Sequence, residues 1–149
     1  MNERAVVRAS TNTNDKVLRR QGVVRRVVDQ SGSCDLNPVR GDWLEELVLS
    51  STPARSAIHE TLAAIGRGDE VHPFAVCPGL WMIASSNRSA RQRQRESIAL
   101  VLTRDILAGE HLDMLCQAGR LDRTVTGSLL GGLDLCEPRD IGRTADLLG

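Results

Sequence analysis

The sequence predicts an α+β domain in which an antiparallel sheet is flanked by helices. Two apolar runs, Leu80–Ala84 and Ser97–Thr103, are separated by a polar stretch, as expected for paired strands at the centre of a sheet. Segments with the apolar spacing of helices lie before and after this pair. A length of 149 residues suits one domain, and a hydrophobic content of 41% is sufficient to form a core.

The N-terminal part divides into a leader and a first strand. Residues 1–15 are polar and are expected to form a flexible leader, so that residues 16–149 make up the single domain. The β-branched residues of Val23–Val28 predict a strand. Asp29–Gly32 has the turn residues of a hairpin, so we expect a hairpin here, with a return strand that is poorly marked in the sequence.

Two helices are expected next. Asp42 is followed three residues later by Glu45, which is the capping-box pattern at the start of a helix. Thr52 and Pro53 supply a cap and a first-turn proline for a second helix, which ends near Gly66.

Residues 71–104 are expected to form the centre of the sheet. Phe74–Cys77 and Leu80–Ala84 flank a Pro-Gly turn, and Ser97–Thr103 returns after a polar tip. In an extended tip, alternation would place Arg91, Arg93 and Arg95 on one face. Their mutual repulsion there requires water or an acidic partner.

The last third predicts three helices. The first covers Glu110–Cys116, Asp122 caps the second, and the third begins near Glu137. The apolar stripe of the third helix consists of Ile141, Ala145 and Leu148. This helix is expected either to pack on its own domain or to act as a C-terminal connector.

The composition argues against several classes of protein. Aromatic residues make up 2% of the chain and tyrosine is absent, which disfavours sites that stack bases, sugars or flavins. No apolar stretch is long enough for a membrane helix, and a net charge of zero disfavours a globally basic nucleic-acid binder. Four dispersed cysteines and the lack of a secretory segment predict a cytoplasmic protein with reduced thiols.

The neutral total hides alternating blocks of charge. Residues 1–40 carry +4, residues 41–87 carry −4, residues 88–104 carry +4 and residues 105–149 carry −4. Such blocks either attract one another within the fold or meet the charge of a partner.

Catalytic and metal chemistry have few candidates. Phosphate-binding, nucleophile-elbow and metalloprotease motifs are absent from the sequence. A cysteine nucleophile would have to pair Cys77 or Cys116 with a distant histidine, the choices being His59, His72 and His111. A carboxylate enzyme would use acidic residues near Cys116, namely Asp105, Glu110 and Asp113. His59 is expected to be solvated, and no metal site is predicted.

No cofactor is predicted, although one residue pair resembles a haem motif. Cys77 precedes Pro78, and a Cys-Pro pair resembles the haem-regulatory motif, whose thiolate is an axial ligand of iron. The alternative is structural: the proline ends one strand segment and Gly79 turns the chain.

The order of these elements resembles that of the PAS and GAF-like sensory modules of bacterial signalling proteins. Val27–Gly32 is similar to the opening hairpin of such modules. Cys77–Trp81, with the strand, arginine-rich tip and Ser97–Thr103 that follow, is similar to their central hairpin. The likeness covers residues 17–148 and extends to the leader regions that precede HD-type phosphohydrolase or phosphatase output domains. It implies a PAS/GAF-like architecture and a regulatory role, without a particular ligand.

The resemblance also indicates where binding would occur. A curved sheet with helices on one face leaves an apolar hollow, and its candidate lining is Cys77, Trp81, Ile83, Leu100 and Leu102. The alternative is that these side chains fill the core. Candidate partner contacts are the arginines of the tip, Arg88, Arg91, Arg93 and Arg95.

We therefore expect a non-catalytic cytoplasmic domain for signal sensing or protein interaction, which regulates an output domain or a protein partner. A homodimer and a small-molecule ligand are both compatible with this reading, whereas membrane and nucleic-acid binding are disfavoured. Two alternatives remain open: a small enzyme that uses a cysteine or a carboxylate, and a dimerisation module without a ligand.

Overall fold

The computed structural model describes residues 16–87 and 95–148 of the chain. Its sheet has four antiparallel strands in the order β1-β4-β3-β2. The strands are β1 (Val23–Val27), β2 (Phe74–Cys77), β3 (Leu80–Asn87) and β4 (Arg95–Leu102). The prediction of an α+β domain with an antiparallel sheet is confirmed. The pairing of β3 with β4 is confirmed as well, and it places Trp81 opposite Val101.

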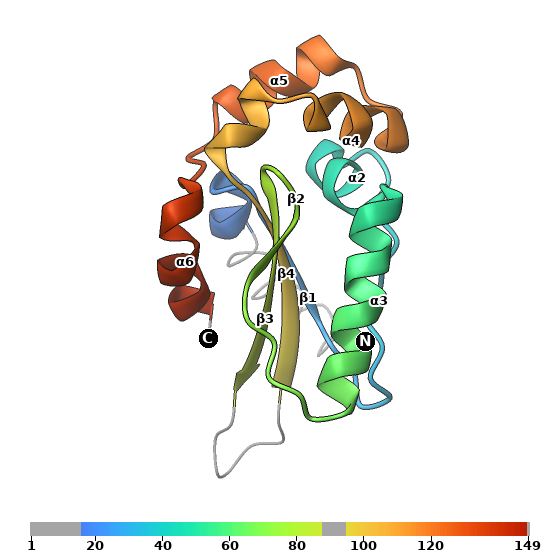
Figure 1. The fold of residues 1–149 in the computed structure, drawn as a ribbon. Coiled ribbons are helices and arrows are strands. Elements are labelled where there is room, and N and C mark those ends of the chain that lie inside the picture. Colours follow the sequence, from blue (N-terminus) through green and yellow to red (C-terminus); the bar gives the residue numbers. More distant parts are fainter. Residues whose placement is uncertain (1–15, 88–94, 149) are drawn as a thin grey trace.

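Helices cover both faces and one end of the sheet. They are α2 (Trp43–Leu49), α3 (Thr52–Gly66), α4 (His111–Gly119), α5 (Arg123–Gly131) and α6 (Ile141–Leu148). Figure 1 shows α2 and α3 on one side of the sheet, α6 on the other, and α4 and α5 across one end. Residues 16–20 are also helical, and short 3-10 segments cover Arg104–Ala108 and Pro138–Asp140.

The two faces of the sheet belong to different apolar clusters, because side chains alternate along a strand. Val24 and Leu100 belong to the larger cluster, which also contains the buried residues of α2, α3 and α4. Val23 and Val101 belong to the smaller cluster, together with Ile141 of α6. The larger cluster is the main core, and the smaller one is the seat of α6.

The predicted helix starts are partly corrected. Asp42 caps α2 as predicted, and its carboxylate accepts from the N–H of Glu45 at 3.2 Å. Glu45 does not close the capping box, because its carboxylate is held by Val39 and by arginines instead. The cap of α3 is Ser51 rather than the predicted Thr52, since the Ser51 hydroxyl accepts from the N–H of Ala54 at 3.2 Å.

The expected N-terminal hairpin is wrong. Asp29 does form a turn, in which its N–H donates to the carbonyl of Ser33 at 2.8 Å. Residues 29–42 nevertheless contain no strand, and β1 pairs with β4. The physical reason is that the segment after the turn lacks alternating β-branched residues, whereas β4 offers an apolar strand.

Two expectations fall on residues that the structure leaves undescribed. The leader, residues 1–15, and the tip, residues 88–94, both lie outside the described residues. Within residues 16–87 and 95–148, the structure contains no helix of the length and hydrophobicity that crossing a membrane requires.

Candidate functional site

The five side chains predicted to line a pocket are divided between the two faces of the sheet. Leu100 and Leu102 belong to the larger cluster, against which Cys77 also packs. Ile83 belongs to the smaller cluster, and Trp81 packs against it. Because Leu100, Leu102 and Ile83 are at most 2% exposed, they fill the core at these positions. The five therefore do not line one common hollow.

The two candidate nucleophiles, Cys77 and Cys116, both have a raised pKa. Burial raises the pKa of Cys77, and the nearby Asp105 carboxylate raises it further. Burial is also the main cause that raises the pKa of Cys116, which is 2% exposed. Asp113, proposed as a catalytic neighbour of Cys116, forms an ion pair with Arg123 at 2.7 Å. Iron ligation and nucleophilic attack both need the thiolate, which these surroundings disfavour.

The other predicted residues are located as follows. His59 is exposed on α3, as expected. Of the arginine candidates, Arg88, Arg91 and Arg93 lie outside the described residues, and Arg95 is the first residue of β4. In the part of the chain that the structure describes, no group of three His, Cys, Asp or Glu side chains is placed to hold a metal ion.

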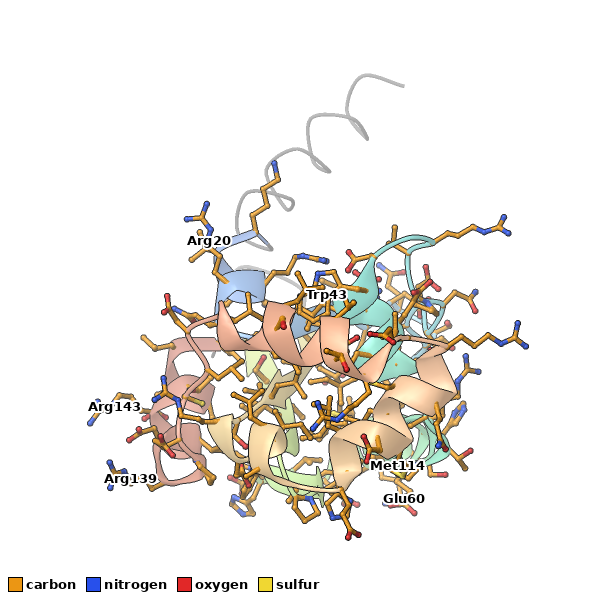
Figure 2. All side chains as sticks on the ribbon, turned by 90° about the horizontal axis from the view of Figure 1, so that it is seen from above. Arg20, Trp43, Glu60, Met114, Arg139 and Arg143 are labelled. Carbon is orange, nitrogen blue, oxygen red and sulfur yellow. The ribbon has the colours of Figure 1, made fainter. Side chains whose placement is uncertain are left out.

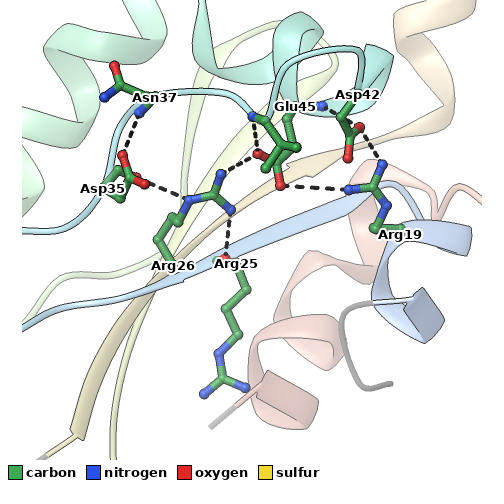
Figure 3. Close-up of polar contacts among 8 residues, drawn as sticks. Arg19, Arg25, Arg26, Asp35, Asn37, Asp42 and Glu45 are labelled. Carbon is green, nitrogen blue, oxygen red and sulfur yellow. Dashed lines mark hydrogen bonds and ion pairs between the residues drawn. The ribbon is translucent and has the colours of Figure 1, made fainter. Parts of the chain in front are cut away.

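An ion-pair cluster joins β1 to the start of α2 (Figure 3). Arg26 pairs with Glu45, and Arg19 pairs with Asp42. A nitrogen of Arg19 also lies 3.7 Å from Glu45 Oε2. The Glu45 side chain is 9% exposed and accepts from the N–H of Val39 at 2.9 Å. Two arginines and one amide thus replace the water that a buried carboxylate loses.

Local structure explains why these side chains meet. Asp42 and Glu45 lie at the cap and in the first turn of α2, where the helix dipole favours negative charge. Arg26 shares the sheet face of Val24, so it points toward α2, and its Nε donates to the carbonyl of Asp35 at 3.1 Å. The cluster therefore fastens the 33–41 loop, β1 and α2 to one another.

The sequence analysis did not single out this cluster, although it contained the signal. The arginines come from the block of +4 at residues 1–40, and the carboxylates come from the block of −4 at residues 41–87. Here, part of the attraction between the blocks is used within the fold.

The face of the sheet that carries α6 is partly polar. Arg25 Nε donates to Ser97 Oγ at 3.2 Å, and the hydroxyl oxygens of Ser97 and Ser85 are 2.7 Å apart. Val27, on the same face of β1, is 56% exposed. Val27 is therefore uncovered, whereas Ser97 is 3% exposed and the part of the face under α6 is apolar.

Three shallow hollows are relevant to binding. One of about 480 Å³ lies between the end of α3 and strands β3 and β4, and its acidic lining is Asp69, Glu70 and Glu96. One of about 300 Å³ follows β1 beside the ion-pair cluster. One of about 240 Å³ lies beside α6 and includes Cys136 and Leu147.

This arrangement offers surfaces for noncovalent binding: a polar sheet face, a strand edge and a helix seated on a small apolar cluster. Figure 2 shows Arg139 and Arg143 pointing away from the body of the molecule. Comparison of the chain with protein families, with curated proteins and with solved structures finds no match.

Proposed function

We propose that the chain is a non-catalytic domain for signal sensing or protein interaction, with a PAS/GAF-like role, and that it acts by releasing and redocking α6. The observation that carries this proposal is that α6 packs on an apolar cluster of its own. Ile141 and Leu148 pack on Val23, Ile83 and Val101 in a cluster distinct from the main core. The main core can therefore persist when α6 leaves.

The energetics of α6 support a reversible contact. α6 is a helix of eight residues, of which Ile141 and Leu148 are buried. Its apolar contact with the sheet is therefore small, and the entropy of ordering its backbone opposes docking. A helix with this balance responds to a ligand or partner that favours one of its two positions.

Two backbone hydrogen bonds hold the segment just before α6 in place. The carbonyl of Cys136 accepts from the N–H of Arg104 at 2.8 Å, and Asp134 N–H donates to the Arg20 carbonyl at 2.7 Å. Glu137 and Pro138 follow at once and lead into α6. A helix that leaves the sheet would thus pivot about a tethered segment, which is how a small rearrangement reaches an output domain or a partner.

The test is amide hydrogen exchange of the full chain, followed by peptide mass. We expect residues 141–148 to exchange through a local opening, well before the amides of β3 and β4. Leu148→Ala should speed exchange in α6 alone. Leu147→Ala is the matched control, because Leu147 is 79% exposed and contributes little to docking.

A fluorescence measurement provides a second readout. Trp81 packs against the α6 cluster, and Trp43 is the only other tryptophan. In a Trp43→Phe background, Leu148→Ala should shift Trp81 emission to the red while the far-UV circular dichroism of the sheet is kept. If α6 exchanges only together with β3 and β4, the proposal is overturned.

A further inference from the structure

A second surface of the molecule is the outer edge of β1. Antiparallel pairing uses the backbone groups of alternate residues, and on β1 these are the even-numbered ones. The carbonyl of Gly22 accepts from Leu102 N–H at 3.0 Å, and Val28 N–H donates to the Glu96 carbonyl at 2.8 Å. Val23, Arg25 and Val27 therefore direct their N–H and C=O groups away from β4. Val23 is 1% exposed, so the open part of this edge consists of Arg25 and Val27.

In the described part of the chain, no strand pairs with this edge. Among residues 16–87 and 95–148, no hydrogen-bond acceptor is found for the N–H groups of Arg25 and Val27. The Arg25 carbonyl accepts only from the guanidinium of Arg26, at 3.2 Å. The hollow of about 300 Å³ runs beside this edge, between β1, Val39 and the start of α2. Free strand edges beside a groove are where extended peptides add to sheets.

The charges around the groove specify what kind of peptide would fit. Its two carboxylates, Asp42 and Glu45, are already paired with Arg19 and Arg26. Lys16 and Arg25 also line the groove. Arg25 bonds to a neutral hydroxyl, and neither cation has a carboxylate partner within the described residues. The lining of the groove therefore has a surplus of positive charge.

A second copy of the chain is a poor occupant of this edge. The sequence of β1 is VVRRV, so antiparallel pairing with its own copy about the centre would place Arg25 opposite Arg25. Like charges in directly opposed positions destabilise a strand pair. An extended segment with acidic side chains would instead place a carboxylate beside Arg25, since Arg26 is already paired with Glu45.

We propose that the outer edge of β1 binds an extended acidic peptide segment of a partner protein, which adds as a fifth strand to the sheet. The backbone supplies the hydrogen bonds, and Lys16 and Arg25 supply the preference for Glu or Asp. This inference goes beyond the proposed function, because it holds whether or not α6 leaves the sheet.

Binding can be measured by fluorescence anisotropy with the full chain and a labelled peptide of alternating Glu and Val residues. We expect saturable binding that weakens as salt is raised to about 0.15 M. Two comparison peptides separate the contributions. A Lys-Val peptide should not bind, and a Glu-Val peptide that is N-methylated at every second residue should lose binding, because it cannot donate to the strand edge.

Variants of the chain assign the binding to the edge. Arg25→Glu should weaken binding at least about tenfold. Arg55→Glu is the matched control, because Arg55 is exposed on α3, far along the chain from β1, and should leave binding unchanged. Circular dichroism of both variants checks that the fold is kept.

Several outcomes overturn the inference. Equal binding by the N-methylated peptide would mean attraction of charge without strand addition. No binding at about 1 mM peptide would mean that the arginines only protect the edge from pairing. Self-association in light scattering that Arg25→Glu abolishes would assign the edge to a second copy. None of these outcomes bears on the exchange rate of α6, so the two proposals fail separately.

Discussion

Glu45 is a buried carboxylate whose partners come from three different segments of the chain. Arg26 is on β1, Arg19 is in the helical residues 16–20, and Val39 is in the loop before α2. Removal of one member of such a cluster leaves the others buried without their partners, which is the main source of the loss in stability.

Glu45→Gln tests this dependence. Glutamine keeps the size of the side chain and an acceptor for Val39, but it removes the charge that neutralises Arg26. We expect the free energy of unfolding to fall by about 1–3 kcal/mol, measured by urea denaturation. Glu46→Gln is the control, since Glu46 forms no ion pair among the described residues. Equal losses in the two variants would contradict the role of the cluster.

Among the elements, α2 and α4 pack closely because one position lacks a side chain. A Cβ on Gly119, the last residue of α4, would lie 2.7 Å from the backbone oxygen of Glu46 on α2. Backbone atoms cannot move aside as the end of a flexible side chain can. The two helices can therefore approach this closely only with glycine at position 119.

Gly119→Ala should push α4 away from α2 and lower the free energy of unfolding by about 1–3 kcal/mol. Gly131→Ala, at the end of α5, is the matched substitution, because a Cβ there has no neighbour within 4 Å. Alanine is the better helix former, so Gly131→Ala should be neutral or stabilising by up to about 1 kcal/mol. Thermal unfolding of both variants measures the difference, and a loss for Gly131→Ala as large as that for Gly119→Ala would refute the steric argument.

For the whole molecule, three cysteine side chains make the free energy of unfolding depend on pH in the alkaline range. Burial is the main cause that raises the pKa of Cys34, Cys77 and Cys116 above the usual 9.0 of a thiol. The folded chain therefore keeps protons that the unfolded chain releases. The stabilisation is complete below pH 9.0 and is lost as the pH rises through the higher pKa of the folded state.

We expect the urea midpoint under reducing conditions to fall as the pH is raised from neutral to above 9.0. Few other groups titrate in this range, because Lys16 is the only lysine and the chain has no tyrosine. The variant with Cys34, Cys77 and Cys116 replaced by Ala should be less stable at neutral pH. Its urea midpoint should, however, fall less as the pH becomes alkaline. If the urea midpoint falls equally in the two proteins, the thiols are not responsible for the pH dependence.

Local interactions explain which parts of the fold the sequence predicted. Asp122 caps α5 as expected, with its carboxylate 2.8 Å from the N–H of Val125. The stripe of Ile141, Ala145 and Leu148 packs against the sheet, which is the first of the two arrangements expected for this helix. Such signals lie within a few residues of one another and need no knowledge of distant segments.

The candidate site was harder to predict, because its members are far apart in the chain. The predicted lining of Trp81, Ile83, Leu100 and Leu102 mixed residues of both sheet faces. Antiparallel register decides which residues share a face, and that register depends on the pairing of strands across the whole sheet. The ion-pair cluster likewise joins Arg19 to Asp42 across 23 residues.

The sequence alone determined the class of fold, the paired strands β3 and β4, and the helix caps Asp42 and Asp122, since apolar period and cap chemistry act over short distances. Only the tertiary structure decided that β1 pairs with β4, that α6 packs on a separate apolar cluster, and that opposite charge blocks meet beside β1. These choices depend on which distant segments bury one another, and burial is a property of the assembled chain.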